Sequence, residues 1–493
     1  MKRSKTNAND KMRAAGAIPL IFVNTFMLSS CAVGPDFETP AAPPAERFTR
    51  EPTASPGNGQ RFQQGAEVSE RWWEAFRSPR LDGLIEDALT HNATIEAAVA
   101  AMGVAHYNAE AGVGPLFPLV GLTSNPTYNL YSGNATNSTV TQTPFSLYTK
   151  QVQISYTLDV WGGARRNLES LDAQAENAGF LMAGAQVMIA ANVAKAAIEE
   201  ASLRAQIAVT RQVIGLEADR LALLQLQLSK GAVSSIDVLS QETAVAQAHQ
   251  RLPALESLLA KQRDSLTALA GRLPQDEVEE TFALSQFSLP RNLPVSLPAQ
   301  LVGQRPDIRA AEANLHSASA QVGVALAARL PSIQLTAAGQ TSAFFIPYLF
   351  QPGTFGYQLA GNAAFTAFDA FTLQNKQRAA EAALDQAKAQ YRDTVVKAFQ
   401  NVADGLRALQ SDARAVAAAR NAESAAKRYL ERVRLQQKFG GVSQLVVVDA
   451  QRSYLNTALA RVQTEAQRLS NTVALYAALG GGWGEASTVE GGG

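Results

Sequence analysis

One stretch of this 493-residue chain occurs twice, and it constrains the fold more than any other feature. It runs from Gly231 to Gly271 and returns 209 positions later, from Gly440 to Gly480. Eight positions are identical in the two copies, namely Gly231/Gly440, Val233/Val442, Ser234/Ser443, Val238/Val447, Glu256/Glu465, Leu266/Leu475, Ala268/Ala477 and Gly271/Gly480. A duplicated stretch predicts duplicated structure, so we expect two equivalent halves.

Each copy has the chemistry of a tight helical hairpin. A glycine can end one helix in the left-handed conformation, and a serine three positions later is a favoured N-cap for the next. The runs before the two turns, Ala164–Lys230 and Leu373–Lys438, contain no proline, and Leu216, Leu223 and Leu226 mark an apolar seam in the first. Roughly 65 residues form a helix of about 100 Å, which must pack along partners as a coiled coil.

Two pairs of segments with alternating polarity indicate β-strands. In 151–160, apolar residues at even positions alternate with polar ones over ten residues, which is the pattern of a tilted transmembrane strand. The other three are Val120–Leu130, Ile333–Thr341 and Tyr357–Phe368. A soluble sandwich strand would not explain the long polar loop 131–148. The loop of the second pair is aromatic, which fits either a membrane-interface girdle or a loop that shapes the outer mouth of a barrel.

Four transmembrane strands per chain cannot close a barrel, because about eight are needed for even a small one. Open edges in lipid would leave backbone amides unpaired, so several chains must share one barrel, and three copies would give twelve strands. No stretch after the N-terminal signal approaches the apolar length of a transmembrane helix, so strands must do the spanning. The predicted fold is a mixed α+β membrane protein, with a shared transmembrane β-barrel continuous with a long α-helical coiled-coil barrel.

The N-terminus has the pattern of a lipoprotein signal. Basic residues precede the apolar stretch Ala14–Leu28, which is too short to span a bilayer as a mature helix. The segment Leu28-Ser29-Ser30-Cys31 resembles a bacterial lipobox, in which the signal peptide is cleaved before the cysteine and lipid is attached to it. The alternative is an ordinary signal peptide with a chance cysteine. Since Ala32 follows Cys31 in place of aspartate, the sorting pattern points to the outer membrane, and Cys31 is the predicted lipidation site.

The order of these features divides the chain into six segments. They are a signal peptide (1–30), a lipid anchor and extended lead (31–80), a first repeat (81–271, with a strand pair at 119–160 and a long hairpin at 164–271), an equatorial linker (272–303), a second repeat (304–480, with a strand pair at 332–368 and a hairpin at 372–479) and a Gly-rich tail (481–493) that we expect to be disordered.

Composition argues against several classes of function. A formal net charge of zero gives no electrostatic footprint for nucleic acid. A single cysteine excludes an intrachain disulfide, and the four histidines are scattered without metal-ligand spacing. The sequence contains no nucleophile elbow, phosphate loop or metal motif. We therefore expect no enzyme activity, no metal and no cofactor beyond the lipid at Cys31.

Motifs spread over most of the chain carry a family resemblance. They are Cys31-Ala32-Val33-Gly34-Pro35-Asp36-Phe37, Trp72-Trp73 with Phe76, Asp159-Val160-Trp161-Gly162-Gly163, Arg305-Pro306-Asp307-Ile308 with Ala311-Glu312, and Asp449-Ala450-Gln451-Arg452. With them the chain resembles the TolC-like outer membrane efflux proteins, in the NodT-type lipoprotein branch that serves resistance-nodulation-division pumps.

This resemblance implies a homotrimer in the outer membrane, with a twelve-stranded barrel, a twelve-helix periplasmic tunnel and an equatorial belt. It implies a passive exit duct for drugs or other toxic small molecules, which a periplasmic adaptor and an inner membrane pump deliver. The alternative within the same fold is the outer membrane duct of a type I protein secretion system.

The resemblance also implies a gate at the periplasmic tip, lined by acidic residues just after the second turn. Asp449 matches such a position, and three copies would form a negative ring that attracts cations. Arg452 could pair with Asp449 or with a neighbouring helix. Some relatives carry a second acidic residue where this chain has Val446, so Val446 and Leu445 could form a hydrophobic constriction. Asp237 is the equivalent of Val446 in the first hairpin, and could face the lumen or bond across the hairpins.

The two hairpin turns are the surface that the resemblance assigns to the adaptor. The residues expected to contact it are Gly231 and Ser234 in the first turn and Gly440, Gly441 and Ser443 in the second.

Overall fold

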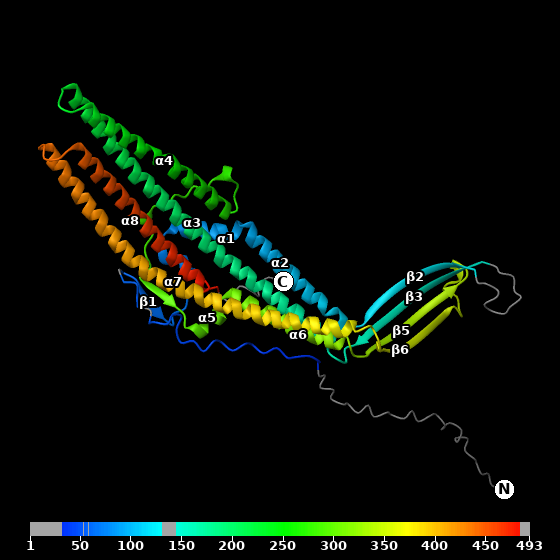
Figure 1. The fold of residues 1–493 in the computed structure, drawn as a ribbon. Helices are drawn as coiled ribbons and strands as arrows, with labels where there is room; N and C mark the ends of the chain where they lie inside the picture. Colours follow the sequence, from blue (N-terminus) through cyan, green and yellow to red (C-terminus); the bar gives the residue numbers. More distant parts are fainter. Residues whose placement is uncertain (1–31, 53, 58, 131–143, 484–493) are drawn as a thin grey trace, which may run out of the picture.

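The computed structural model describes residues 32–52, 54–57, 59–130 and 144–483. The molecule is elongated, with two helical hairpin tips at one end, a β-sheet at the other and long helices between them (Figure 1). Cys31, the predicted signal peptide before it and the tail from residue 484 lie outside the described residues.

The two halves of the chain contain the same elements in the same order. The first half has α1 (Pro79–His91), α2 (Ala93–Gly112), β2 (Leu119–Asn129), β3 (Phe145–Leu158), α3 (Gly163–Ser229) and α4 (Ser235–Leu269). The second has α5 (Pro298–Gln304), α6 (Pro306–Ala327), β5 (Ser332–Ala343), β6 (Phe355–Ala364), α7 (Thr372–Lys438) and α8 (Gln444–Ala478). Both α3 and α7 have 67 residues, and both α4 and α8 have 35, so the duplication extends to element length.

The four long strands form one antiparallel sheet in the order β2-β3-β5-β6. The outer edges of β2 and β6 have no partner strand among the described residues. The helices continue this order, because α2 packs on α3, α3 on α6 and α6 on α7. Each half of the sheet therefore passes directly into its own half of the helical layer (Figure 1).

The sheet has one apolar and one polar face, which follows from its register, since residues paired across neighbouring strands point to the same side. The apolar face carries Val120, Leu122, Val152, Ile154, Tyr156, Leu158, Ile333, Leu335, Ala337, Leu359 and Ala363. The polar face carries Gln151, Gln153, Ser155, Thr157, Gln334, Thr336, Gln340, Gln358 and Asn362. This two-faced pattern is typical of barrel strands with lipid outside and water inside.

Sheet and helices join through the same device in both halves. After β3, the carboxylate of Asp159 accepts hydrogen bonds from the backbone N–H groups of Ala164 (3.0 Å) and Arg165 (3.1 Å). After β6, the carboxylate of Asp369 accepts equivalent bonds from the first two residues of α7 (3.1 and 2.7 Å). Burial opposes ionisation of Asp159, but these bonds hold its pKa below the usual value. Because such bonds satisfy amides that lack an intrahelical partner, both long helices start at a fixed point.

Midway along the helices, irregular segments wrap the bundle. The strand β1 (Arg61–Gln64) of the lead pairs in parallel with β4 (Asn292–Val295) of the linker. The buried ring of Trp72, in the 3₁₀ helix η1 (Trp72–Phe76), stacks on Tyr476 of α8 with centroids 5.4 Å apart. Lead, linker and the end of α8 thus form one belt around the helices.

The glycines that close the repeated stretch make equivalent contacts in this belt. Gly271 lies against the carbonyl group of His91, where α1 gives way to α2. Gly480 lies against the carbonyl group of Gln304, where α5 gives way to α6. Both glycines have positive φ, and a β-carbon at either position would overlap the neighbouring backbone. Close backbone approach explains why both copies end in glycine.

Three details differ from the predictions. β3 begins at Phe145, so part of the predicted polar loop 131–148 is strand. β6 ends at Ala364, four residues before the predicted end, where the chain turns towards Asp369. The segment 272–303, predicted to be an equatorial linker, contains β4, the 3₁₀ helices η4 (Pro274–Asp276) and η5 (Leu284–Gln286), and most of α5. Since α5 is the counterpart of α1, the second structural repeat starts at Pro298.

α3 corrects the expectation that no later segment would be apolar enough for a transmembrane helix. It contains an 18-residue window with a mean hydropathy of 1.5, of which 61% is buried inside the molecule. Alanines such as Ala190, Ala194 and Ala197 let neighbouring helices approach it closely. The apolar character of α3 is therefore explained by its place in the protein core.

Candidate functional site

The two hairpin tips have turns of the same geometry. Gly231 and Gly440 have φ values of +73° and +74°, which glycine adopts without strain. In each turn, the N–H of the next residue donates to the carbonyl five positions back, Gln227 in the first tip and Gln436 in the second, both at 2.9 Å. The five turn residues predicted to contact an adaptor are all exposed, namely Gly231, Ser234, Gly440, Gly441 and Ser443.

The helices that leave the turns are capped differently. Ser234 and Asp237 form a capping box, in which the Ser234 hydroxyl accepts from the Asp237 N–H and the Asp237 carboxylate accepts from the Ser234 N–H. Hydrogen bonds from Ser234 lower the pKa of Asp237. Ser443 is also an N-cap, but its side chain caps no N–H group of α8, and Val446 replaces the acidic partner. Asp237 therefore serves its own hairpin, and the described chain shows no bond from it to the second one.

Asp449 and Arg452 are both exposed on α8, and they do not pair with each other among the described residues. Arg452 instead donates from Nη2 to Oε1 of Gln247 on α4, at 2.7 Å. One turn further along, Arg251 of α4 donates to Asn456 of α8, at 3.3 Å. Of the two partners expected for Arg452, the structure shows the neighbouring helix, and this contact ties one hairpin to the other.

Val446 lies within the second hairpin, half-buried against an apolar cluster. The cluster consists of Leu430 and Val433 of α7 with Val447 and Ala450 of α8, all buried. Leu445, the other residue of the predicted constriction, is 59% exposed. In one chain, Val446 therefore holds α7 against α8, and Leu445 is the side chain free to face a pore.

A buried polar network joins the two hairpins just behind their tips. We define it as the tip network, consisting of Glu217 and Arg220 of α3, Gln241 of α4 and Gln444 of α8. The side-chain amide of Gln241 donates to the carboxylate of Glu217, and that of Gln444 donates to Oε1 of Gln241, at 2.7 Å. Arg220 donates from Nε to Oε1 of Gln444, also at 2.7 Å. Gln241 is fully buried and Glu217 is 2% exposed.

Glu217 is the titratable carboxylate of the tip network. Burial raises its pKa above the ordinary value of 4.5, whereas the hydrogen bond from Gln241 and the positive charges of Arg452 and Arg434 act in the opposite direction. Arg452 comes from α8, Arg434 from α7 and Gln241 from α4, while Glu217 itself lies on α3. All four helices of the tip thus set the charge state of this one group.

Sequence reasoning missed the tip network because it placed the seam of α3 on the wrong face. Leu223 and Leu226 are 43% and 57% exposed, so they do not form the interior of this chain. The buried seam instead passes through Val213, Glu217 and Leu224, at spacings of four and seven. A glutamate at a seam position was the available signal.

At the opposite end of the helices, the start of the lead is fixed beside the sheet. The N–H of Val33 donates to the carbonyl of Trp161 (3.0 Å), and the ring of Phe37 stacks on His316 with centroids 4.3 Å apart. Gly34 and Gly323 face each other so closely that a β-carbon on Gly34 would lie 2.5 Å from the α-carbon of Gly323. The residue that follows Cys31 is therefore held where β3 meets α3.

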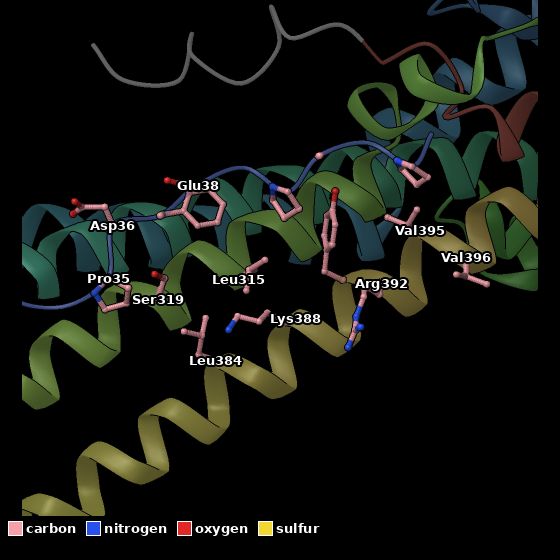
Figure 2. Close-up of a pocket in the computed structure, with 15 residues that line it drawn as sticks. Pro35, Asp36, Glu38, Leu315, Ser319, Leu384, Lys388, Arg392, Val395 and Val396 are labelled. Carbon is pink, nitrogen blue, oxygen red and sulfur yellow. The ribbon is translucent and has the colours of Figure 1, made fainter. Parts of the chain in front are cut away.

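The next part of the lead covers a cavity of about 750 Å³ (Figure 2). Leu315 of α6 and Lys388 and Arg392 of α7 lie beneath the lead. The cavity also touches Tyr391, which is 5% exposed and whose hydroxyl has no hydrogen-bond partner in the described part of the chain. Burial raises the pKa of Tyr391. The lead is thus clamped at its start and bridges a gap further on.

Comparisons with known proteins agree with this architecture. The profile of a family described as "Outer membrane efflux protein" matches residues 84–272 and 297–481. The "Toluene efflux pump outer membrane protein TtgC" of Pseudomonas putida is 29% identical over 469 residues, which cover 94% of this chain and 95% of that protein. The "Cation efflux system protein CusC" of Escherichia coli is 26% identical over 477 residues, covering 94% and 98%.

Solved structures show the same fold. The outer membrane protein VceC of Vibrio cholerae has a TM-score of 0.78 at 26% identity, covering 84% of this chain and 99% of that one. The outer-membrane channel OprN has a TM-score of 0.84 at 24% identity, covering 92% and 100%. The predicted combination of a four-stranded sheet with long helical hairpins is confirmed.

Proposed function

Because the chain belongs to the outer membrane efflux protein family, we propose that it is the outer membrane exit duct of a tripartite efflux system. It passively exports small molecules, such as drugs or other toxic compounds, that an inner membrane pump delivers through a periplasmic adaptor. One observation carries this function: a two-faced, open-edged sheet passes directly into helices of 67 residues. The sheet supplies the wall of a membrane pore, and the helices extend that wall by about 100 Å.

The duct is a homotrimer. Lipid excludes an open sheet edge, so β6 of one copy must pair with β2 of the next, and three copies give a barrel of about twelve strands. α2 and α7 end the helical layer on the same two sides, so they meet in the same way. The apolar face then contacts lipid, and the polar face lines the lumen.

The exposed turns are the docking surface for the adaptor. Both tips present a glycine turn and an exposed serine at the end farthest from the sheet (Figure 1). The relatives support the class of cargo, because TtgC and CusC carry the names of toluene and cation efflux components. A type I protein secretion duct would share the fold, and no contact in the described residues favours it.

Lipid on Cys31 anchors the duct at the membrane surface. Ala32 lies against Gly162, directly below the end of β3, and a β-carbon on Gly162 would lie 2.6 Å from that of Ala32. Ala32 is thus held where the apolar face of the sheet ends, which supports a lipid anchor attached to the residue before it.

Asp449 closes the duct with its symmetry copies. Its side chain is exposed on α8 and forms no hydrogen bond or ion pair within the described part of the chain. Three carboxylates around the axis form a cation-attracting ring, while Arg452 holds α8 to α4 through Gln247.

Single-channel recording of the purified protein in planar bilayers tests this function. We expect a heat-modifiable trimer with small, cation-selective openings, which Asp449→Ala widens several-fold and makes less selective. Removal of an exposed charge should leave the stability of the trimer unchanged, since exposed side chains contribute little to it. Unchanged conductance and selectivity would remove Asp449 from the constriction. A trimer that inserts and never conducts would contradict the exit-duct function.

A further inference from the structure

The polar face of the sheet changes character at its outer end, the end farthest from the helices. The ladder between β2 and β3 is unbroken from Leu119–Ser155 to Asn129–Phe145, so odd-numbered residues of β3 share one face along its whole length. Phe145 and Leu147 therefore lie on the same face as Gln151 and Gln153. Large apolar side chains thus take the place of glutamines on this face of β3 at its end nearest the mouth.

A third apolar residue joins them from the neighbouring strand. Phe344 directly follows β5, and its ring meets that of Phe145 edge-on, with centroids 5.5 Å apart and planes at 87°. The last ladder pair of these strands is Tyr148–Ala343, so the next position places Phe344 opposite Leu147. Phe344 remains 58% exposed, so much of its ring is accessible from the mouth.

The other aromatic residues in the strands at this end belong to the opposite face. Tyr148, Phe355 and Tyr357 share the register of the apolar face, together with Lys150. Aromatic rings beside a lysine are typical of a membrane interface. The register therefore fits both alternatives for the aromatic segment, each with different residues: a girdle on the apolar face and an apolar group on the polar face.

The loop that carries Phe344 has a fixed shape. The side chain of Leu349 is buried. Its backbone carbonyl accepts hydrogen bonds from the hydroxyls of Thr341 and Thr354, the latter at 2.8 Å. The backbone N–H of Ser342 donates to the carbonyl of Thr354 at 3.1 Å. The exposed rings are thus presented by a hydrogen-bonded loop.

We propose that Phe145, Leu147 and Phe344 form an apolar collar inside the outer mouth, which binds aromatic groups of solutes leaving the duct. The inference rests on the proposed function as an exit duct. The sequence contains no charged residue from Leu330 to Phe368, and Lys150 lies on the other face, so the collar has no charge of its own to select ions. Aromatic rings in its place attract other rings and organic cations. The barrel brings three collars to one opening.

Block of single-channel current by an organic cation tests the collar. The probes are benzyltrimethylammonium and tetramethylammonium, which have the same charge and differ in an aromatic ring. All recordings use the Asp449→Ala protein, so that the aspartate ring does not contribute to block. We expect benzyltrimethylammonium to block at concentrations about three- to tenfold lower than tetramethylammonium, given the strength of aromatic contacts.

Substitution of the collar should remove this difference between the probes. Phe145→Ser with Phe344→Ser is the main variant, and Phe344→Ser alone is the variant that leaves every strand residue intact. Phe350→Ser is the matched control, because Phe350 is 80% exposed in the same loop and lies outside both strands. Equal block by the two probes in the starting protein, a difference that survives in the double variant, or an equal loss in the control would overturn the collar. Absence of conductance in every variant would overturn the exit-duct function itself.

Discussion

The two hairpin tips have equal lengths and equal turns, yet they are stabilised differently. The first tip is fixed locally, by the capping box of Ser234 and Asp237. The second has no side-chain cap, and holds its helices together with the apolar cluster around Val433 and Val447. The second tip is also tied to the first, through Arg452 on Gln247 and through the tip network. Duplication has preserved the shape of the tip, while the interactions that stabilise it have diverged.

This difference assigns unequal roles to the hairpins. A helix whose start is capped by its own residues keeps its geometry when its neighbours move. A helix whose first residue, Gln444, bonds to Arg220 and Gln241 of the other hairpin, as well as to Gln437 of its own, is ordered in part by that contact. Movement at the tip should therefore be a displacement of α7 and α8 from a first hairpin that stays fixed.

The largest effect should come from Glu217→Ala in the tip network. The substitution removes the carboxylate that accepts from the fully buried amide of Gln241, which keeps only the backbone carbonyl of Glu217 (3.1 Å), and loss of a hydrogen bond to a charged group costs about 1–3 kcal/mol. Because the carboxylate orients the Gln241 side chain that accepts from Gln444 of the second hairpin, we expect the mean conductance of the trimer to rise several-fold in planar bilayers. Glu217→Gln is the matched control, since its amide oxygen can still accept from Gln241. Similar conductance in both variants would show that the bond from Gln241 to Glu217 does not support the contact between the hairpins.

The same carboxylate should make the closed tip sensitive to pH. The pKa of Glu217 is raised in the folded tip, so its contribution to stability is fully present below the ordinary pKa of 4.5 and is lost as pH rises through the folded value. We therefore expect the ratio of wild-type to Glu217→Gln conductance to increase between pH 4 and pH 8. The positive charges of Arg434 and Arg452 lower the pKa of Glu217 and so oppose the effect of burial. Replacement of Arg452 by Gln should therefore raise the pKa of Glu217 further. A ratio that stays constant with pH would exclude titration of Glu217.

Sequence patterns predicted the duplicated elements because glycine turns, proline-free runs and alternating strands are local signals. The start of β3 was missed because Phe145 and Leu147 are apolar residues on the face that is polar in the rest of the strand. The alternation that identified the strand from residue 151 onwards is therefore reversed at its start. The tip network was missed for a different reason: Glu217, Gln241 and Gln444 are far apart in sequence, and only the packing of α8 beside α4 brings them together. Positions of elements are encoded locally, whereas contacts between hairpins depend on the rotation of each helix.

A smaller effect is expected for Asp237→Ala, which makes the first tip resemble the second. Loss of the bond from the Ser234 N–H to the Asp237 carboxylate should destabilise the start of α4 by about 1 kcal/mol, while the backbone N–H of residue 237 can still donate to the Ser234 hydroxyl. This corresponds to roughly fivefold faster amide exchange over the first turn of α4, measured by hydrogen–deuterium exchange. Exchange at the start of α8 should stay unchanged, because the second tip does not use this cap. Equal acceleration in both tips would contradict the independence of the first.

The smallest effect should come from the reverse change, Val446→Asp, which places an acidic residue three positions after Ser443. A capping box there could contribute about 0.5–1 kcal/mol, but the half-buried contact of Val446 with the apolar cluster is lost at the same time, so the melting temperature should change by only a degree or two. Val446→Ala separates the two terms, because it loses the packing without gaining the cap. We expect amide exchange at the start of α8 to be several-fold slower in the aspartate variant than in the alanine variant. If the two exchange alike, Ser443 is held by the contacts of Gln444 with the first hairpin in a geometry that a local cap cannot adopt, and the second tip depends on the first for its order.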